Sequence, residues 1–134
     1  MDLALSSEQV ALRDAIREFL AAEYPIAVAK EATQSLAGYS VEAWRKMANL
    51  GWLGIGMPEQ YGGGGLGLEE LAIMYEECGR GLYQGPHFGS ALLCGQAILG
   101  LGSEVQKQEL LPGLASGSLI MSLALLEEDA RWEE

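Results

Sequence analysis

Apolar side chains recur at helical spacing near the start of the chain. One face contains Leu12, Ile16, Phe19 and Leu20. Ser6 followed by Gln9 forms the capping-box pattern that begins a helix. Because the residue before a proline avoids the α-helical region, Pro25 predicts that this helix ends near Tyr24.

Two shorter helices and an irregular connection are predicted to follow. The alanine-rich stretch 26–35 favours one helix, and Ser40 is suited to cap a third helix that Gly51 ends. The helical period is lost between residues 51 and 67, where glycines gather around Pro58 and beyond it. We therefore expect a long connection without regular structure there.

The helical period returns at Leu68. The apolar stripe of this helix contains Leu71, Tyr75, Cys78 and Leu82. A second apolar helix is predicted over about 88–99. Ser103 with Gln106 forms another capping box, and the helix that it begins is predicted to end at Leu111–Pro112. Together these patterns predict an all-α bundle of about five to six helices.

The final apolar run, residues 119–126, differs from the helices. It is short and lies between Gly117 and a run of acids, which is typical of a buried strand. A single strand cannot satisfy its own backbone hydrogen bonds, so it continues into a sheet elsewhere, pairs between chains or is frayed. We expect a helical domain over residues 1–118. Residues 119–134 are then the start of a β-domain or an acidic tail.

Composition and charge exclude several functional classes. Nineteen acids against eight bases give a net charge of −11, which argues against a nucleic-acid or anionic-membrane partner. Cys78, Cys94 and the single His87 cannot supply a zinc site, so no metal is predicted. The most apolar stretch, 88–102, is too short to span a bilayer, and residues 1–4 show no signal-peptide pattern. We expect a cytoplasmic protein.

Three motifs could carry chemistry, and each has a simpler interpretation. Residues 62–67 match G-x-G-x-x-G, but Glu69–Glu70 place negative charge where a phosphate would bind, which favours a structural loop. The acidic pairs Glu69–Glu70 and Glu76–Glu77 are expected on a solvated helix face. His87 has no triad arrangement around it and is expected to be a loop or core histidine. No catalytic residue is predicted.

The charge-free stretch 81–103 leaves two interpretations open. Its small residues are Gly89, Ser90, Ala91, Gly95 and Ala97. Small side chains allow two helices to pack closely. They also leave room along an apolar groove for a lipid-like ligand.

An ordered set of motifs runs through the chain. The motifs are Ser6-Ser7-Glu8-Gln9 with Leu12-Arg13-Asp14 and Phe19; Leu50-Gly51-Trp52-Leu53-Gly54-Ile55; Met57-Pro58-Glu59-Gln60-Tyr61-Gly62-Gly63; Glu76-Glu77-Cys78-Gly79-Arg80; Gly102-Ser103-Glu104-Val105-Gln106-Lys107; Leu111-Pro112; and Ala115-Ser116-Gly117. In this order and spacing they resemble the N-terminal helical domain of flavin-dependent acyl-CoA dehydrogenases, over essentially all 134 residues.

The resemblance implies a larger enzyme than this chain encodes. In the family, a β-domain and a second helical domain follow this one, and FAD lies mainly between those two domains and a neighbouring subunit. A glutamate in the last domain removes the α-proton of an acyl-CoA while the β-hydride passes to flavin. The electrons then leave through an electron-transfer flavoprotein.

The resemblance also implies roles for residues of this chain. The acyl pocket is expected to be walled by Gly85, Pro86, Gly89, Ser90 and Leu93. The flavin-contacting positions correspond to Leu123, Leu125 and Leu126. Leu126 lacks the hydroxyl that the family places there, and residues 129–132 replace a glycine-rich loop. We therefore expect this chain alone to bind no FAD.

Two functional classes follow from these expectations. The first is the N-terminal part of an FAD-dependent oxidoreductase of fatty acid metabolism, which walls the acyl pocket and is inactive alone. The second is a freestanding helical module that binds an apolar ligand or a protein partner without catalysis. An acyl-CoA-type ligand fits the first class, and self-association through residues 119–126 into a homo-oligomer is expected.

Overall fold

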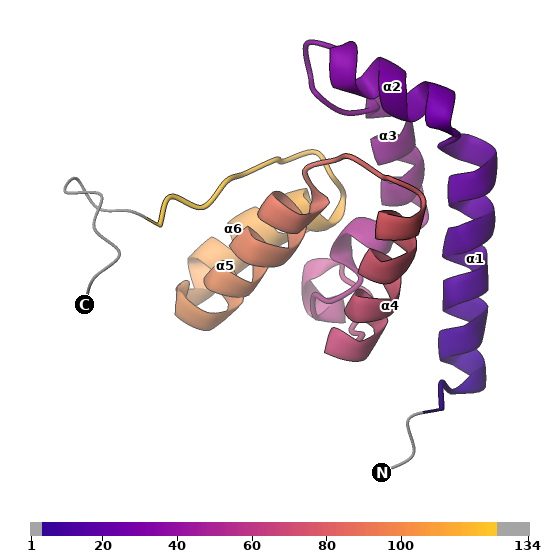
Figure 1. Ribbon diagram of the computed structural model, residues 1–134. Helices are drawn as coiled ribbons and strands as arrows, with labels where there is room; N and C mark the ends of the chain where they lie inside the picture. The colour runs from indigo at the N-terminus through magenta and orange to yellow at the C-terminus, as the bar shows by residue number, and fades with distance from the viewer. Residues whose placement is uncertain (1–3, 126–134) are drawn as a thin grey trace, which may run out of the picture.

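The computed structural model describes residues 4–125, which form six α-helices, one π-helix and two 3₁₀ turns (Figure 1). In chain order these are α1 Ser7–Glu23, α2 Ile26–Gln34, α3 Val41–Asn49, the turns η1 Trp52–Gly54 and η2 Glu59–Tyr61, α4 Leu68–Arg80, the π-helix η3 Phe88–Cys94, α5 Gly95–Leu101 and α6 Glu104–Ala115. No strand occurs among residues 4–125, and the predicted all-α class is confirmed.

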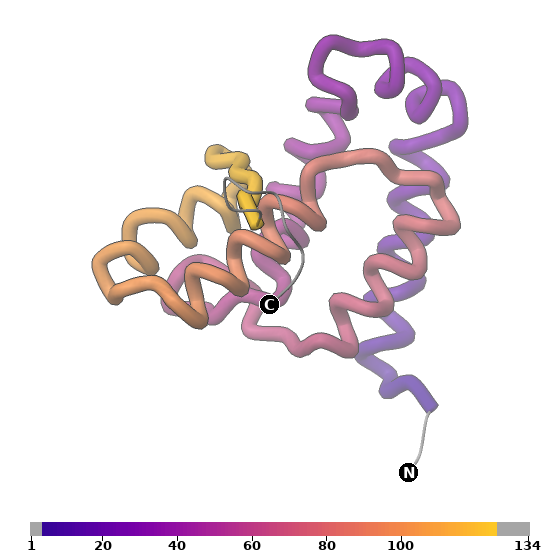
Figure 2. Tube along the Cα trace, turned by 60° about the vertical axis from the view of Figure 1, so that its left-hand side comes forward, coloured from indigo at the N-terminus to yellow at the C-terminus, as the bar shows by residue number. Residues whose placement is uncertain are grey.

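The helices form two groups (Figure 1 and Figure 2). Helices α1 and α4 pack along each other, and α2 lies at one end of this pair. Helix α5 lies beside α6, and both views separate these two from α1 and α4. Because α6 also contacts η1 and η2, the connection between α3 and α4 joins the two groups.

Each group has its own buried apolar cluster. The larger cluster includes Ile16, Leu20, Tyr24, Trp44, Met47, Leu53, Leu71 and Met74. The smaller cluster consists of Met57, Tyr61, Ala91, Cys94, Leu111, Leu114 and Ala115. Within residues 52–61, Leu53 and its neighbours Trp52 and Ile55 belong to the larger cluster, and Met57 and Tyr61 belong to the smaller one. This short connection therefore holds η3, α5 and α6 against the first group.

The predicted helix starts at both ends of the domain are confirmed. The Ser6 hydroxyl oxygen accepts the Gln9 N–H at 3.2 Å, and the Gln9 side-chain oxygen accepts the Ser6 N–H at 3.0 Å. Helix α1 ends at Glu23, one residue before its predicted end. The same reciprocal pair, Ser103 and Gln106, begins α6. These local motifs set the helix boundaries independently of the rest of the fold.

The glycine-rich connection 51–67, predicted to have no regular structure, contains the short turns η1 and η2 and folds back on itself. The Gly64 N–H donates to the Gly54 carbonyl at 2.9 Å. A side chain at Gly63 would collide with the Met57 carbonyl, because the backbone passes too close to that oxygen. The glycines thus allow close backbone approach, which confirms the interpretation of this motif as a structural loop.

The predicted end of α6 at Leu111–Pro112 needs correction. Helix α6 continues through Pro112 to Ala115, and the Ser116 N–H donates to the Pro112 carbonyl at 3.0 Å. The proline removes one helical hydrogen bond, but its neighbour Leu111 and the following Leu114 are fully buried, and this burial outweighs the loss. Residues 119–125 have no regular structure, which is the frayed outcome among the three expected for a single strand, and Leu126 lies outside the described residues.

Candidate functional site

The predicted pocket residues lie around the π-helix η3, at the start of the second helical group. Sequence reasoning predicted one helix over 88–99, whereas the chain forms a wider π-helical turn before α5. Phe88 and Leu93 are 55% and 37% exposed, and no atom lies within 4 Å of a Cβ built on Gly89. We call the open apolar surface of Phe88, Gly89 and Leu93 the η3 face.

The turn before η3 holds two more of the predicted residues, Gly85 and Pro86. Gly85 lies against the ring of Tyr83, and a side chain there would collide with the Tyr83 hydroxyl. The Pro86 carbonyl accepts the N–H of Ser90 at 2.8 Å and so begins the helical bonding of η3. Both residues therefore shape the entry of the chain into η3.

Ser90 has a different environment from its neighbour Gly89. It is 1% exposed, and its hydroxyl oxygen accepts the Met121 N–H at 3.0 Å. Successive residues on a helix point in different directions, so Gly89 lies at the open surface while Ser90 is directed inwards. The Ser90 hydroxyl thus binds the backbone of the segment that follows α6.

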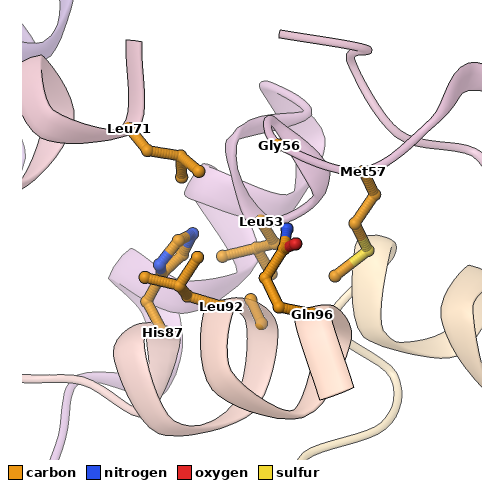
Figure 3. Close-up of a pocket in the computed structure, with 8 residues that line it drawn as sticks. Leu53, Gly56, Met57, Leu71, His87, Leu92 and Gln96 are labelled. Carbon is orange, nitrogen blue, oxygen red and sulfur yellow. The ribbon is translucent and has the colours of Figure 1, made fainter. Parts of the chain in front are cut away.

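A small cavity lies between η3, α4 and the connection (Figure 3). It is lined by Leu53, Gly56, Met57, Leu71, His87, Ala91, Leu92 and Gln96. Its volume is about 10 Å³, room for roughly one water molecule. Because ligand pockets occupy roughly 300–1,000 Å³, this cavity is too small for an acyl group. The open side of the helix is the η3 face.

His87 is a buried histidine with both ring nitrogens hydrogen-bonded. It is 3% exposed, its Nε2 lies 3.1 Å from the Trp52 carbonyl oxygen, and its Nδ1 lies 2.6 Å from the Tyr75 hydroxyl. Because a carbonyl only accepts, Nε2 carries the proton, and neutral Nδ1 accepts from Tyr75. Burial lowers the pKa of His87 and raises the pKa of Tyr75, which keeps the imidazole neutral and the phenol protonated. The prediction of a core histidine is confirmed.

Glu77 corrects the expectation of a solvated acidic face. Its side chain is 3% exposed, and Arg17 binds both carboxylate oxygens, with Nε at 2.9 Å and Nη2 at 2.7 Å. The hydrogen bonds from Arg17 hold the pKa of Glu77 below its usual value despite burial. The neighbouring Glu76 instead pairs with Arg80 at the surface, as expected. Glu77 therefore joins α4 to α1 and is not a free acid or base.

The segment 119–125 carries two of the three predicted flavin contacts. Leu123 and Leu125 are 40% and 67% exposed, and Leu126 lies outside the described residues. Between residues 4 and 125, the last hydrogen bond to this segment is the one from Met121 to Ser90. The two leucines therefore present apolar side chains on an otherwise unpaired stretch of backbone.

Other kinds of site find no support in the structure. The carboxylate of Glu70 accepts the Gly67 N–H at 2.9 Å, so the chain's own acid occupies the start of α4. Hydrogen bonds from Gln9 and Gly67 hold the pKa of Glu70 below its usual value. Residues 4–125 contain no group of three His, Cys, Asp or Glu side chains that could hold a metal ion. No helix in the same range is long and apolar enough to cross a membrane.

Three contacts were missed by sequence reasoning. The Tyr75–His87, Arg17–Glu77 and Ser90–Met121 hydrogen bonds join residues 12, 60 and 31 positions apart. Local patterns do not reveal such partners. For Glu77 there was one signal: it follows the apolar Ile73 and Met74 by four and three residues, which places it on the buried face of α4.

Comparison with known proteins places these features in a family context. The family model described as "Acyl-CoA dehydrogenase, N-terminal domain" matches residues 6–118. Acyl-CoA dehydrogenase FadE12 of Mycobacterium tuberculosis is 37% identical over 136 residues, covering 93% of this chain and 32% of FadE12. The mitochondrial isovaleryl-CoA dehydrogenase of Bos taurus is 40% identical over 132 residues, covering 94% of this chain and 30% of that protein.

A solved structure has the same fold. The glutaryl-coenzyme A dehydrogenase in complex with glutaryl-CoA superimposes with a TM-score of 0.84 at 30% identity. The match covers 98% of this chain and 34% of that protein. The chain thus spans about a third of the length of the relatives that it matches.

Proposed function

This chain belongs to the acyl-CoA dehydrogenase family through that family's N-terminal domain, and we propose that it forms one wall of an acyl-CoA pocket. The observation that carries the proposal is the η3 face, where Phe88 and Leu93 are exposed and the Cβ position of Gly89 is open. Two of the related proteins are named for isovaleryl-CoA and glutaryl-CoA. Both compounds are CoA thioesters, and they differ in the acyl group. The proposed ligand class is therefore an acyl-CoA thioester, whose CH–CH bond is oxidised in the complete enzyme.

The contribution of this chain is shape and exclusion of water. Burial of an apolar acyl chain contributes about 0.8 kcal/mol per CH₂, so an apolar wall holds the acyl group in a defined position. Because Gly89 has no side chain and its Cβ position is open, this surface leaves room for an acyl group. In this proposal, proton abstraction belongs to groups outside the described residues, and the domain alone does not turn over substrate.

The described residues fit a contact with a flavin ring and not a complete flavin site. The family is FAD-dependent, and bound flavin accepts the hydride in its reaction. Leu123 and Leu125 are exposed, and the backbone from residue 122 to 125 has no hydrogen-bond partner within residues 4–125. We propose that these two leucines pack on the ring, beside free backbone N–H groups, and that Leu126 continues this contact.

The same segment is the proposed surface for self-association. Ile120, Leu123 and Leu125 expose apolar side chains, and the backbone of residues 122–125 makes no hydrogen bond within residues 4–125. An exposed apolar edge of this kind binds a second strand readily. We propose that a second copy of the chain pairs with residues 119–126, which gives the homo-oligomer expected for the family.

The proposal is tested by calorimetric titration of isovaleryl-CoA and of free CoA into the purified chain. The test variant is Gly89→Trp, which fills the open space of the η3 face. The matched control is Gly100→Trp in α5, since Gly100 is also exposed and has no atom within 4 Å of a built Cβ. Circular dichroism checks that both variants keep the helix content of the original chain.

We expect isovaleryl-CoA to bind more tightly than free CoA. Gly89→Trp should weaken this binding at least about tenfold, equal to about 1.4 kcal/mol, and Gly100→Trp should leave it unchanged. Equal affinity of the Gly89→Trp variant and the original chain would remove the η3 face as the acyl wall. Equal binding of acyl-CoA and CoA, or binding of neither, would favour a helical module with another apolar ligand or partner.

A further inference from the structure

Hydrogen bonds tie the chain that leaves α6 back to the domain, and three of them reach residues 117, 119 and 121. The Trp44 indole N–H donates to the Gly117 carbonyl at 3.1 Å, and the Leu119 N–H donates to the Gly113 carbonyl at 3.0 Å. The third bond, from the Met121 N–H to Ser90, is the last one along the described chain. The first two bonds hold residues 117 and 119 close to the end of α6, so only the third acts on the chain beyond residue 119.

The Ser90 hydroxyl is well suited to fix a backbone position. Ser90 is almost fully buried, and its own N–H is held by the Pro86 carbonyl at 2.8 Å, so the hydroxyl belongs to a constrained turn of η3. Met121 packs against the smaller core cluster, and its hydrogen bond to the buried Ser90 hydroxyl is partly buried. Removing the acceptor therefore leaves the Met121 N–H without a protein partner.

The hydrogen bond between Met121 and Ser90 lies between the two proposed contact regions. On one side it begins at η3, directly beside Gly89 of the proposed acyl wall. On the other side it ends two residues before Leu123 and four before Leu125, the proposed ring contacts. A side-chain bond therefore joins the element that would bind the acyl group to the segment that would bind flavin.

We propose that Ser90 is a positioning residue that sets the place of residues 121–125 relative to the η3 face. In the complete enzyme this bond holds the flavin-facing leucines at a constant distance from the acyl wall, so that ring and acyl chain meet in one geometry. The catalytic part of this inference rests on the proposed function. The positioning of the segment by Ser90 does not.

Two substitutions separate hydrogen bonding from packing. Ser90→Ala removes the acceptor, and Ser90→Cys retains a side chain of similar shape with a weak acceptor. Ser122→Ala is the matched control, because Ser122 is an exposed serine next to Met121. The first readout is the amide hydrogen-exchange rate of Met121 measured by NMR, with the fully buried Met74 in α4 as internal reference.

We expect both Ser90 variants to raise the Met121 exchange rate roughly five- to tenfold and to leave Met74 unchanged. Ser122→Ala should change neither rate. An unchanged Met121 rate would overturn the proposal, because the bond would then not hold the segment. An equal rise at Met121 and Met74 would also overturn it, since Ser90 would then be an ordinary core residue.

The second readout tests the connection between the two proposed sites. Isovaleryl-CoA should shift the amide resonance of Leu123 in the original chain, and this shift should shrink in Ser90→Ala at equal ligand occupancy. A shift of the same size in both would overturn the connection. If the original chain binds no acyl-CoA, the proposed function fails, while the exchange rates still decide whether Ser90 positions the segment.

Discussion

Replacing Tyr75 by phenylalanine removes one oxygen atom from the buried network around His87. The rings of Tyr75 and His87 pack edge to face with centroids 5.5 Å apart, and the substitution leaves this contact in place. What is lost is the 2.6 Å hydrogen bond from the Tyr75 hydroxyl to His87 Nδ1. Since His87 is 3% exposed, bulk water does not reach the ring, and a substitute donor could come only from a water molecule in the small cavity beside it.

The size of the effect follows from that burial. A buried acceptor without a partner costs about 1–3 kcal/mol, so we expect Tyr75→Phe to lower the free energy of unfolding by about 2 kcal/mol. For a domain of this size, about 1 kcal/mol corresponds to a midpoint shift of roughly 4 °C, which predicts a fall of about 8 °C. Thermal unfolding followed by circular dichroism measures it. A fall of less than about 2 °C would refute the assignment of this bond as a buried, unreplaced contact.

The same network predicts a dependence of stability on pH. Burial holds the pKa of His87 below its ordinary value in the folded chain, whereas the unfolded chain takes up its proton near pH 6.5. The unfolded state then binds more protons, so stability falls as the pH decreases below about 6.5, by up to about 1.4 kcal/mol per unit. His87 is the single histidine of the chain, and the carboxylates with lowered pKa values act only below about pH 4.5.

Urea unfolding between about pH 7.5 and 5 separates this contribution from the others. We expect His87→Phe to be less stable than the original chain at neutral pH, because the Trp52 carbonyl and the Tyr75 hydroxyl lose their partner. Its stability should stay nearly constant over this interval, since the titrating group is gone. Equal slopes of stability against pH in the two proteins would show that His87 is not held neutral by burial.

Two further predictions concern helix α6 and the α1–α4 contact. Ser103→Ala should cost about 1 kcal/mol, because the Gln106 N–H loses its cap, and an unchanged thermal midpoint would contradict this. Arg17→Ala should raise the pKa of the Glu77 carboxyl, measured by NMR titration, because the buried carboxylate loses its two closest donors. Arg45→Ala, which removes an exposed arginine from α3, serves as its control, and an equal pKa in both variants would contradict the assigned cause.

The parts of the fold that were predicted from sequence depend on residues close together in the chain. The Ser6 and Ser103 caps each need a partner only three residues away, and Pro25 acts on its immediate neighbour. The path of α6 through Pro112 could not be read in the same way. It depends on the burial of Leu111 and Leu114 against residues from η2 and η3, which a local rule for proline does not include.

The candidate site shows the same division between local and distant causes. The family resemblance predicted both Gly89 and Ser90 as pocket residues, and both lie in η3. Which of the two faces outward depends on the π-helical turn and on Met121, 31 residues away from Ser90. Gly89 then contributes by lacking a side chain, and Ser90 contributes by binding the next segment. In the proposed function, two adjacent residues therefore serve one pocket in different ways: Gly89 shapes the wall and Ser90 positions the segment that faces it. Only the packed structure separates these two roles.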